Sequence, residues 1–151
     1  NGDTSIMSPD DLSGKVVCTQ LASGSEKATQ EWEKDMKSRG LKGFKELKLF
    51  TAHPEATLAV ANGTCDAQTQ PLPNLAVVAK NQKGVFELVG PISGKAYMAW
   101  VTRPEDTDLR DYLSSKILEM RDKGIIDEIQ EKWFGFKMPI PSEGHLPEGA
   151  L

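Results

Sequence analysis

Short strand-like runs alternate with longer helical segments in the first half of the chain, and this alternation limits the folds available to it. The run GKVVCTQ (14–20) is rich in β-branched residues and follows a glycine, and ELKLFTA (46–52) is a second such run. Between them, apolar residues such as Trp32 and Met36 recur every four positions, which predicts a helix. Strands separated by helices predict a parallel α/β sheet.

The alternation continues beyond the second strand. We expect a helix over 53–62, a third strand over 65–70 (CDAQTQ), a helix in LPNLAVVAKNQKG (72–84) and a fourth strand over 85–90. Residues 10–92 are therefore predicted to form a three-layer α/β lobe with a mainly parallel sheet.

The pattern changes after residue 92. A hydrophobic strand is predicted over 97–103 (YMAWVTR), followed by one amphipathic helix that ends at Gly124 and a second that ends at Gly135. One strand and two helices cannot enclose a core, so we expect residues 98–136 to pack on something else. Their apolar residues should otherwise be exposed; these are Trp100, Tyr112, Ile117, Met120, Ile129 and Trp133. The last residues, 137–151, contain several prolines and glycines and predict an extended tail.

Composition excludes several classes of protein. The chain is 38% hydrophobic and 26% charged, without an apolar run near the ~20 residues that span a bilayer, so we expect no transmembrane segment. The net charge of −4 shows no basic surplus, so we expect no nucleic-acid partner. The start, Asn-Gly-Asp, has neither Met nor a leader and is typical of a mature or excised piece.

The cysteines and histidines do not form a reactive or metal-binding pattern. Cys18 and Cys65 are far apart, without the CxxC or Cys/His clustering of a zinc or redox site. The sequence leaves open whether they are a buried thiol pair or a disulfide. His53 and His145 are distant from each other and lack suitable neighbours. We therefore expect no metal, no cofactor and no enzymatic activity.

Candidate binding residues follow the predicted strands, because ligands bind beyond the carboxyl ends of parallel strands. Ser23, Gly24 and Ser25 precede or begin a helix, whose free N–H groups favour an anion, although Ser25 could simply cap that helix. The other candidates are the neutral side chains of Gln20 and Gln70, which could instead solvate the strand ends, and His53, which could simply precede a helix.

The order of the motifs resembles a known family. DLSGKVV, PEATLAVANGTCDA and GPISGKAYMAWVTR are followed by DLRDYLSSKILEMRDKGIIDEIQEKWFG, and together they cover about residues 10–136. This succession resembles the C-terminal half of type II periplasmic solute-binding proteins, in the family-3 group that serves ABC transporters. The resemblance implies a periplasmic protein that traps a small polar solute between two lobes and delivers it to a membrane ABC permease.

The resemblance also assigns parts of the chain. It implies that residues 10–92 are lobe two and that 93–97, from Ser93 to Tyr97, are a hinge strand. Residues 98–136 would complete a first lobe whose larger part is not in this sequence, and their apolar face would favour self-association. The resemblance places Cys18 and Cys65 on neighbouring strands. An oxidising periplasm favours a disulfide between them, whereas partners on adjacent parallel strands often have unfavourable geometry.

The resemblance implies one departure in the binding site. The turn at residues 23–25 would hold a ligand carboxylate, but Pro71 stands where amino-acid binders usually have an Asp that pairs with the ligand ammonium. Proline has neither a charge nor an N–H group. Burying an ammonium without a counter-charge costs on the order of several kcal/mol, so a standard α-amino acid held in the usual way is not expected.

A second function would fit the same scaffold. Some relatives are associated with periplasmic quinoprotein methanol dehydrogenases and act on a protein partner. A cleft wall without the acidic residue would suit such an accessory protein, so a periplasmic enzyme is an alternative partner.

Overall fold

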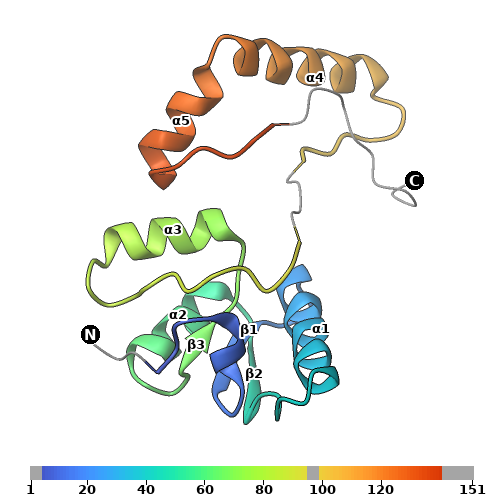
Figure 1. The fold of residues 1–151 in the computed structure, drawn as a ribbon. Coiled ribbons are helices and arrows are strands. Elements are labelled where there is room, and N and C mark those ends of the chain that lie inside the picture. Colours follow the sequence, from blue (N-terminus) through green and yellow to red (C-terminus); the bar gives the residue numbers. More distant parts are fainter. Residues whose placement is uncertain (1–4, 95–98, 141–151) are drawn as a thin grey trace. The chain divides into compact units, whose positions relative to one another are not determined.

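The computed structural model describes residues 5–94 and 99–140. The chain divides into two compact units, Asn1–Lys95 and Ala96–Leu151, whose elements are labelled in Figure 1. No helix in the described ranges is long and apolar enough to cross a bilayer. Each unit is described by itself below.

The first unit is built on a small parallel sheet. Strands β1 (Val16–Gln20), β2 (Glu46–Phe50) and β3 (Ala67–Gln68) lie in the order β2-β1-β3. Both pairings are parallel, with Val17 opposite Leu47 on one side and Ala67 on the other. The predicted α/β class with a parallel sheet is confirmed.

Helices cover both faces of the central strand. Side chains alternate across a strand, so Cys18 faces the opposite side from Val17 and Thr19. Cys18 packs in a buried cluster with Ala56 and Ala59 of α2 (His53–Ala61). On the other face, Thr19 is linked through Thr69 to Thr29 of α1 (Gly24–Ser38). A further helix, α3 (Leu72–Asn81), follows β3 and buries Ala76.

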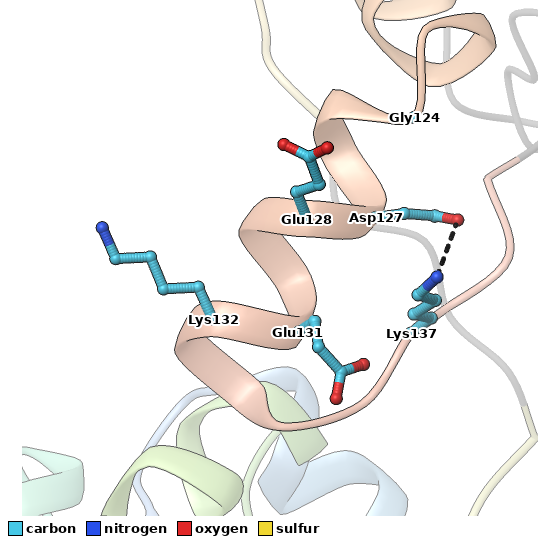
Figure 2. Close-up of a pocket in the computed structure, with 6 residues that line it drawn as sticks. All are labelled: Gly124, Asp127, Glu128, Glu131, Lys132 and Lys137. Atoms are coloured by element: carbon cyan, nitrogen blue, oxygen red, sulfur yellow. Dashed lines mark ion pairs between the residues drawn. The ribbon is translucent and has the colours of Figure 1, made fainter.

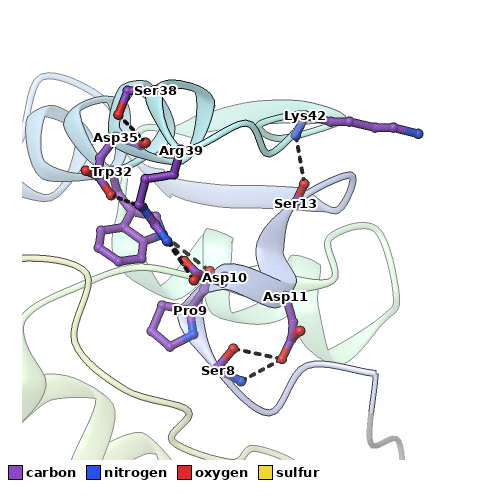
Figure 3. A network of polar contacts seen from close by, with 10 residues as sticks. All are labelled: Ser8, Pro9, Asp10, Asp11, Ser13, Trp32, Asp35, Ser38, Arg39 and Lys42. Carbon is purple, nitrogen blue, oxygen red and sulfur yellow. Dashed lines mark hydrogen bonds and ion pairs between the residues drawn. The ribbon is translucent and has the colours of Figure 1, made fainter.

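A short 3₁₀ helix, η1 (Pro9–Leu12), is fastened to α1. Arg39, the residue that ends α1, forms ion pairs with Asp10 and Asp35, and its guanidinium lies 5.2 Å from the ring centroid of Trp32. Figure 3 shows these contacts between the two elements. Trp32 Nε1 also donates to the carbonyl oxygen of Pro9 over 3.3 Å. Side chains of Trp32 and Arg39 thus hold η1 against α1.

Two predicted strands are absent from the described part of the chain. Residues 85–90 and 99–103 form no ladder, so those predictions were wrong. Ser93 and Gly94 of the predicted hinge strand are not in a strand either, and 95–98 lie outside the described residues. A hydrophobic run becomes a strand only when a neighbouring strand accepts its hydrogen bonds, and β1 already has a partner on each side. The third strand is also shorter than its predicted 65–70, because Cys65 N donates to Ala59 O and Pro71 has no N–H.

The described part of the second unit contains two helices, α4 (Thr107–Asp122) and α5 (Ile125–Phe134). The stops predicted at Gly124 and Gly135 are confirmed, because both glycines adopt left-handed φ values, 73° and 82°. Across residues 99–140 the one buried side chain is polar, Gln130. Trp100, Tyr112, Ile129 and Trp133 are exposed, as expected, whereas Ile117 and Met120 are half-buried.

The absence of a buried apolar side chain over 99–140 means that this stretch contributes no core of its own. The part of the expected tail that covers residues 141–151, with His145, lies outside the described residues.

Candidate functional site at the carboxyl edge of the sheet

The turn between β1 and α1 is closed by Ser23. Its Oγ accepts a hydrogen bond from Glu26 N at 3.2 Å and donates to Gln20 O at 2.7 Å. Ser23 is therefore the N-cap, and the alternative that Ser25 caps the helix is wrong, because Ser25 lies inside the first turn. The missed signal was the Ser-x-x-Glu spacing of Ser23 and Glu26, since Glu26 Oε2 also reaches back to Ala22 N at 2.6 Å.

This closure leaves two main-chain donors free at the start of α1. Ala22 adopts a left-handed φ of 54°, which turns the chain sharply out of β1. Lys27 N bonds Ser23 O, and Glu26 N bonds Ser23 Oγ. Within the described residues, Gly24 N and Ser25 N have no hydrogen-bond acceptor. Free N–H groups at a helix start can bind an anion.

Gln20 is engaged within the protein. Its Nε2 donates to Thr51 O at 3.2 Å and so links the end of β1 to the residue after β2. Its amide therefore holds the edge of the sheet together.

His53 lies at the first position of α2. Its carbonyl oxygen accepts from Gln68 Nε2 at 3.1 Å and from Thr57 Oγ1 at 3.0 Å. Its Nδ1 is buried and has no partner among the described residues. Burial lowers the pKa of His53 from its ordinary value of 6.5, so the neutral imidazole is favoured near pH 7. A neutral Nδ1 can accept or donate one hydrogen bond, depending on its tautomer.

Gln70 follows β3 and carries a second unpartnered group. Its Nε2 is buried, with no hydrogen-bond partner among the described residues. The next residue, Pro71, is the N-cap of α3 and provides no side-chain cap. Leu72, at the first position of α3, is half exposed.

The edge formed by residues 20–26, 51–55 and 69–74 is almost free of charge. Its acidic residues are Glu26 and Glu55, and it contains no Lys or Arg. Glu26 is used in the α1 turn. Glu55 Oε2 accepts from Thr51 N, Thr51 Oγ1 and Ala52 N, at 3.1, 2.8 and 3.3 Å. The groups left for a ligand are neutral.

The remaining predicted site residues lie elsewhere. Ser93 is exposed and donates to the adjacent Gly94 O, and Tyr97 lies outside the described residues. Cys18 and Cys65 are buried free thiols, and burial is the main cause that raises the pKa of Cys18. Their disulfide stays a prediction. Over the described residues, no three His, Cys, Asp or Glu side chains are grouped as a metal site requires.

A hollow on α5 was not predicted from the sequence. It is lined by Gly124, Asp127, Glu128, Glu131, Lys132 and Lys137 (Figure 2). Lys137 Nζ lies 3.6 Å from Asp127 Oδ2, and charges of both signs border the hollow. Such a surface has no feature that selects one ligand.

The first unit is an α/β lobe with a parallel sheet, an architecture in which ligands generally bind beyond the carboxyl ends of the strands. No protein-family model matches the chain. A Vibrio harveyi protein named as an amino-acid ABC transporter-binding protein, PatH, is 26% identical over 136 residues, which are 89% of this chain and 51% of that protein.

The similar solved structures also belong to solute-binding proteins. The structure of an ancestral arginine-binding protein bound to arginine is 34% identical, with a TM-score of 0.64 over 89% of this chain and 57% of that one. Substrate-binding domain 2 of Lactococcus lactis GlnP, in an open conformation, shares the fold with a TM-score of 0.63 at 21% identity, over 90% of this chain and 56% of that one. The predicted resemblance is confirmed: this chain is related to substrate-binding proteins of amino-acid ABC transporters.

This relationship has limits. The chain spans about half the length of the Vibrio relative. The relatives are solute-binding proteins, which are not enzymes, and this kinship supports the expectation of no catalysis. None of the comparisons supports the alternative of an accessory protein for a methanol dehydrogenase.

Proposed function

We propose that this chain belongs to a periplasmic protein that captures a small polar solute and delivers it to a membrane ABC permease. The observation that carries this proposal is the neutral carboxyl edge of the sheet, where Gly24 N, Ser25 N and the Gln70 amide lack partners in the described structure. The kinship with ABC transporter substrate-binding proteins supports it.

The start of α1 is proposed to hold a carboxylate of the solute. The hydroxyl proton of Ser23 is already donated to Gln20 O, so Ser23 cannot donate it to a ligand. Recognition at residues 23–25 therefore relies on the main-chain N–H groups of Gly24 and Ser25, assisted by the positive end of the helix dipole.

The Gln70 amide and His53 would bind neutral polar groups of the solute, with Pro71 as part of the wall. Residues 20–26, 51–55 and 69–74 offer no unengaged carboxylate to pair with an ammonium. We therefore propose that the solute presents a carboxylate and uncharged polar groups to this unit. The proposed solute therefore differs from arginine, which is the ligand in the structure of the ancestral arginine-binding protein.

Two lobes are part of the proposal. Residues 10–92 would form lobe two, 93–97 the hinge and 98–136 part of lobe one. The lack of a buried apolar side chain over 99–140 supports this assignment, since that stretch needs other apolar surface to pack against. A solute that contacts both lobes would stabilise the closed form.

A pair of substitutions at Gly24 tests the proposal. Gly24→Pro removes one N–H at the first helical position, where proline is favoured, and the extended Ser23 before it is compatible with proline. Gly24→Ala keeps the N–H, and a Cβ there meets no atom within 4 Å. Calorimetry would use the standard L-amino acids, their N-acetyl derivatives, succinate and glutarate.

We expect at least one of these compounds to bind the unsubstituted protein when both proposed lobes are present. Gly24→Pro should weaken that binding about tenfold, the loss for one hydrogen bond to a charged group, and Gly24→Ala should leave it unchanged. Failure of every compound to bind would reject the proposed function. Equal binding by both variants would reject the role of the α1 turn.

A further inference from the structure

Three buried threonines from separate segments meet beside the proposed site. Thr19 on β1 and Thr29 on α1 are both fully buried, and Thr69, which follows β3, is 9% exposed. Thr19 Oγ1 donates to Thr69 O at 2.9 Å, and the Oγ1 atoms of Thr29 and Thr69 lie 2.6 Å apart. These contacts define a threonine network of Thr19, Thr29 and Thr69.

The direction of the hydrogen bonds follows from proton counting. Thr29 Oγ1 donates its single proton to Ser25 O at 2.6 Å, one turn earlier in α1. The proton between Thr29 and Thr69 must then come from Thr69. The network therefore runs from Thr69 through Thr29 to the first turn of α1, which carries the free N–H groups of the proposed site.

Every polar group of Thr69 is engaged. Its N donates to Cys18 O at 3.0 Å, its O accepts from Thr19 and its hydroxyl donates to Thr29. The next residue, Gln70, has the opposite character, because its Nε2 is buried without a partner. Buried polar groups without a partner are rare in folded proteins, so this donor needs an acceptor oxygen from outside the described residues.

We infer that the threonine network fixes Gln70 as a hydrogen-bond donor to the solute, which makes Thr29 and Thr19 positioning residues. This inference rests on the proposed function. Hydrogen bonds at all three polar groups of Thr69 hold its backbone, and they therefore also hold the backbone of the adjacent Gln70 at the edge of the sheet. A preorganised donor loses less conformational entropy on binding than a mobile one.

Isosteric substitutions separate this role from a structural one. Thr29→Val removes the hydroxyl but keeps the branched shape, and Thr29→Ser keeps the hydroxyl but loses the methyl group. Thr19→Val is the equivalent change on β1, where a β-branched residue suits the strand. It replaces Thr29→Val as the test variant if Thr29→Val does not fold. Gln70→Ala, alone and combined with Thr29→Val, reports whether the effect passes through Gln70.

Two quantities are measured for each variant. The first is its affinity for whichever amino acid, N-acetyl derivative or dicarboxylate binds the unsubstituted protein best. The second is the mobility of the Gln70 side-chain amide without solute, from NMR relaxation. We expect Thr29→Val to weaken binding about fivefold and to increase the mobility of the amide. Thr29→Ser should bind within about twofold of the unsubstituted protein, and the double variant should bind no more weakly than Gln70→Ala.

The outcomes distinguish the two proposals. If the unsubstituted protein binds no compound of the panel, the proposed function fails and the inference fails with it. If it binds but folded Thr29→Val or Thr19→Val binds equally well, the threonine network is structural and the inference alone is overturned. Additive losses in the double variant would also overturn it, because Thr29 would then act independently of Gln70.

Discussion

The guanidinium of Arg39 holds both carboxylate oxygens of Asp10, with Nη1 2.8 Å from Oδ2 and Nη2 2.7 Å from Oδ1. The planar fork of arginine suits this two-point contact, which joins η1 to the end of α1. The pKa of Asp10 is lowered from its ordinary value of 3.8, chiefly by the hydrogen bonds from Arg39.

The Asp10–Arg39 contact should make the stability of the first unit sensitive to acid. A carboxylate whose folded pKa is depressed stabilises the fold above its unfolded pKa, near 3.8, and this contribution is lost as the pH falls through the folded value. Thermal unfolding from pH 6 to pH 2.5 should show Asp10→Asn less stable than the unsubstituted protein at pH 6. The two melting temperatures should converge below pH 3.8. A constant difference across this range would contradict the assignment.

Ala22 should be a point of backbone strain. A left-handed conformation costs a non-glycine residue about 1 kcal/mol, so Ala22→Gly is expected to raise the free energy of unfolding by about that amount. Ala28→Gly, within α1, is the control and should lower it by about 0.5–1 kcal/mol. Urea unfolding of both variants gives the comparison. Destabilisation by both substitutions would show that the turn at Ala22 is not strained.

Pro71 should decide whether an ammonium can bind at this edge. Pro71→Asp places a carboxylate at the N-cap of α3, where Asp is favoured, and Pro71→Asn caps the helix without a charge. Both variants should be at least as stable as the unsubstituted protein. With Asp, calorimetry should show about tenfold tighter binding of amino acids with a free ammonium, and no such gain for their N-acetyl derivatives. An equal gain with Asn would exclude the charge as the cause.

Cys18 and Cys65 should react slowly with thiol reagents in the folded protein. Both are buried, and burial raises the pKa of Cys18, which suppresses the reactive thiolate. Mass spectrometry should show slow labelling by N-ethylmaleimide at pH 8 and rapid labelling of both thiols after unfolding. Protein that takes up no label when unfolded, until a reductant is added, would instead contain the predicted disulfide.

Helices were predictable from the sequence because their signals are local. The four-residue recurrence through Trp32 and Met36 places α1, and Gly124 and Gly135 end α4 and α5 as predicted. The runs at 85–90 and 99–103 have the composition of strands, but a strand depends on a partner elsewhere in the chain.

The candidate site was predictable in part. The carboxyl ends of the strands follow from the α/β order, whereas the threonine network depends on how β1 and β3 pair, which no local pattern encodes. The Ser-x-x-Glu spacing distinguishes Ser23 from Ser25 as the cap, and it was readable from the sequence.

The double use of the Ser23 hydroxyl has a consequence for the evolution of the proposed carboxylate site. A receptor made of peptide groups is unaffected by most changes of side chain, so positions 24 and 25 could drift without altering what is bound, provided that proline is avoided. An alanine scan of this turn should therefore detect a folding defect of about 1 kcal/mol at Ser23 and nothing at its two neighbours. Alanine scans that rank residues by lost binding would therefore overlook the turn.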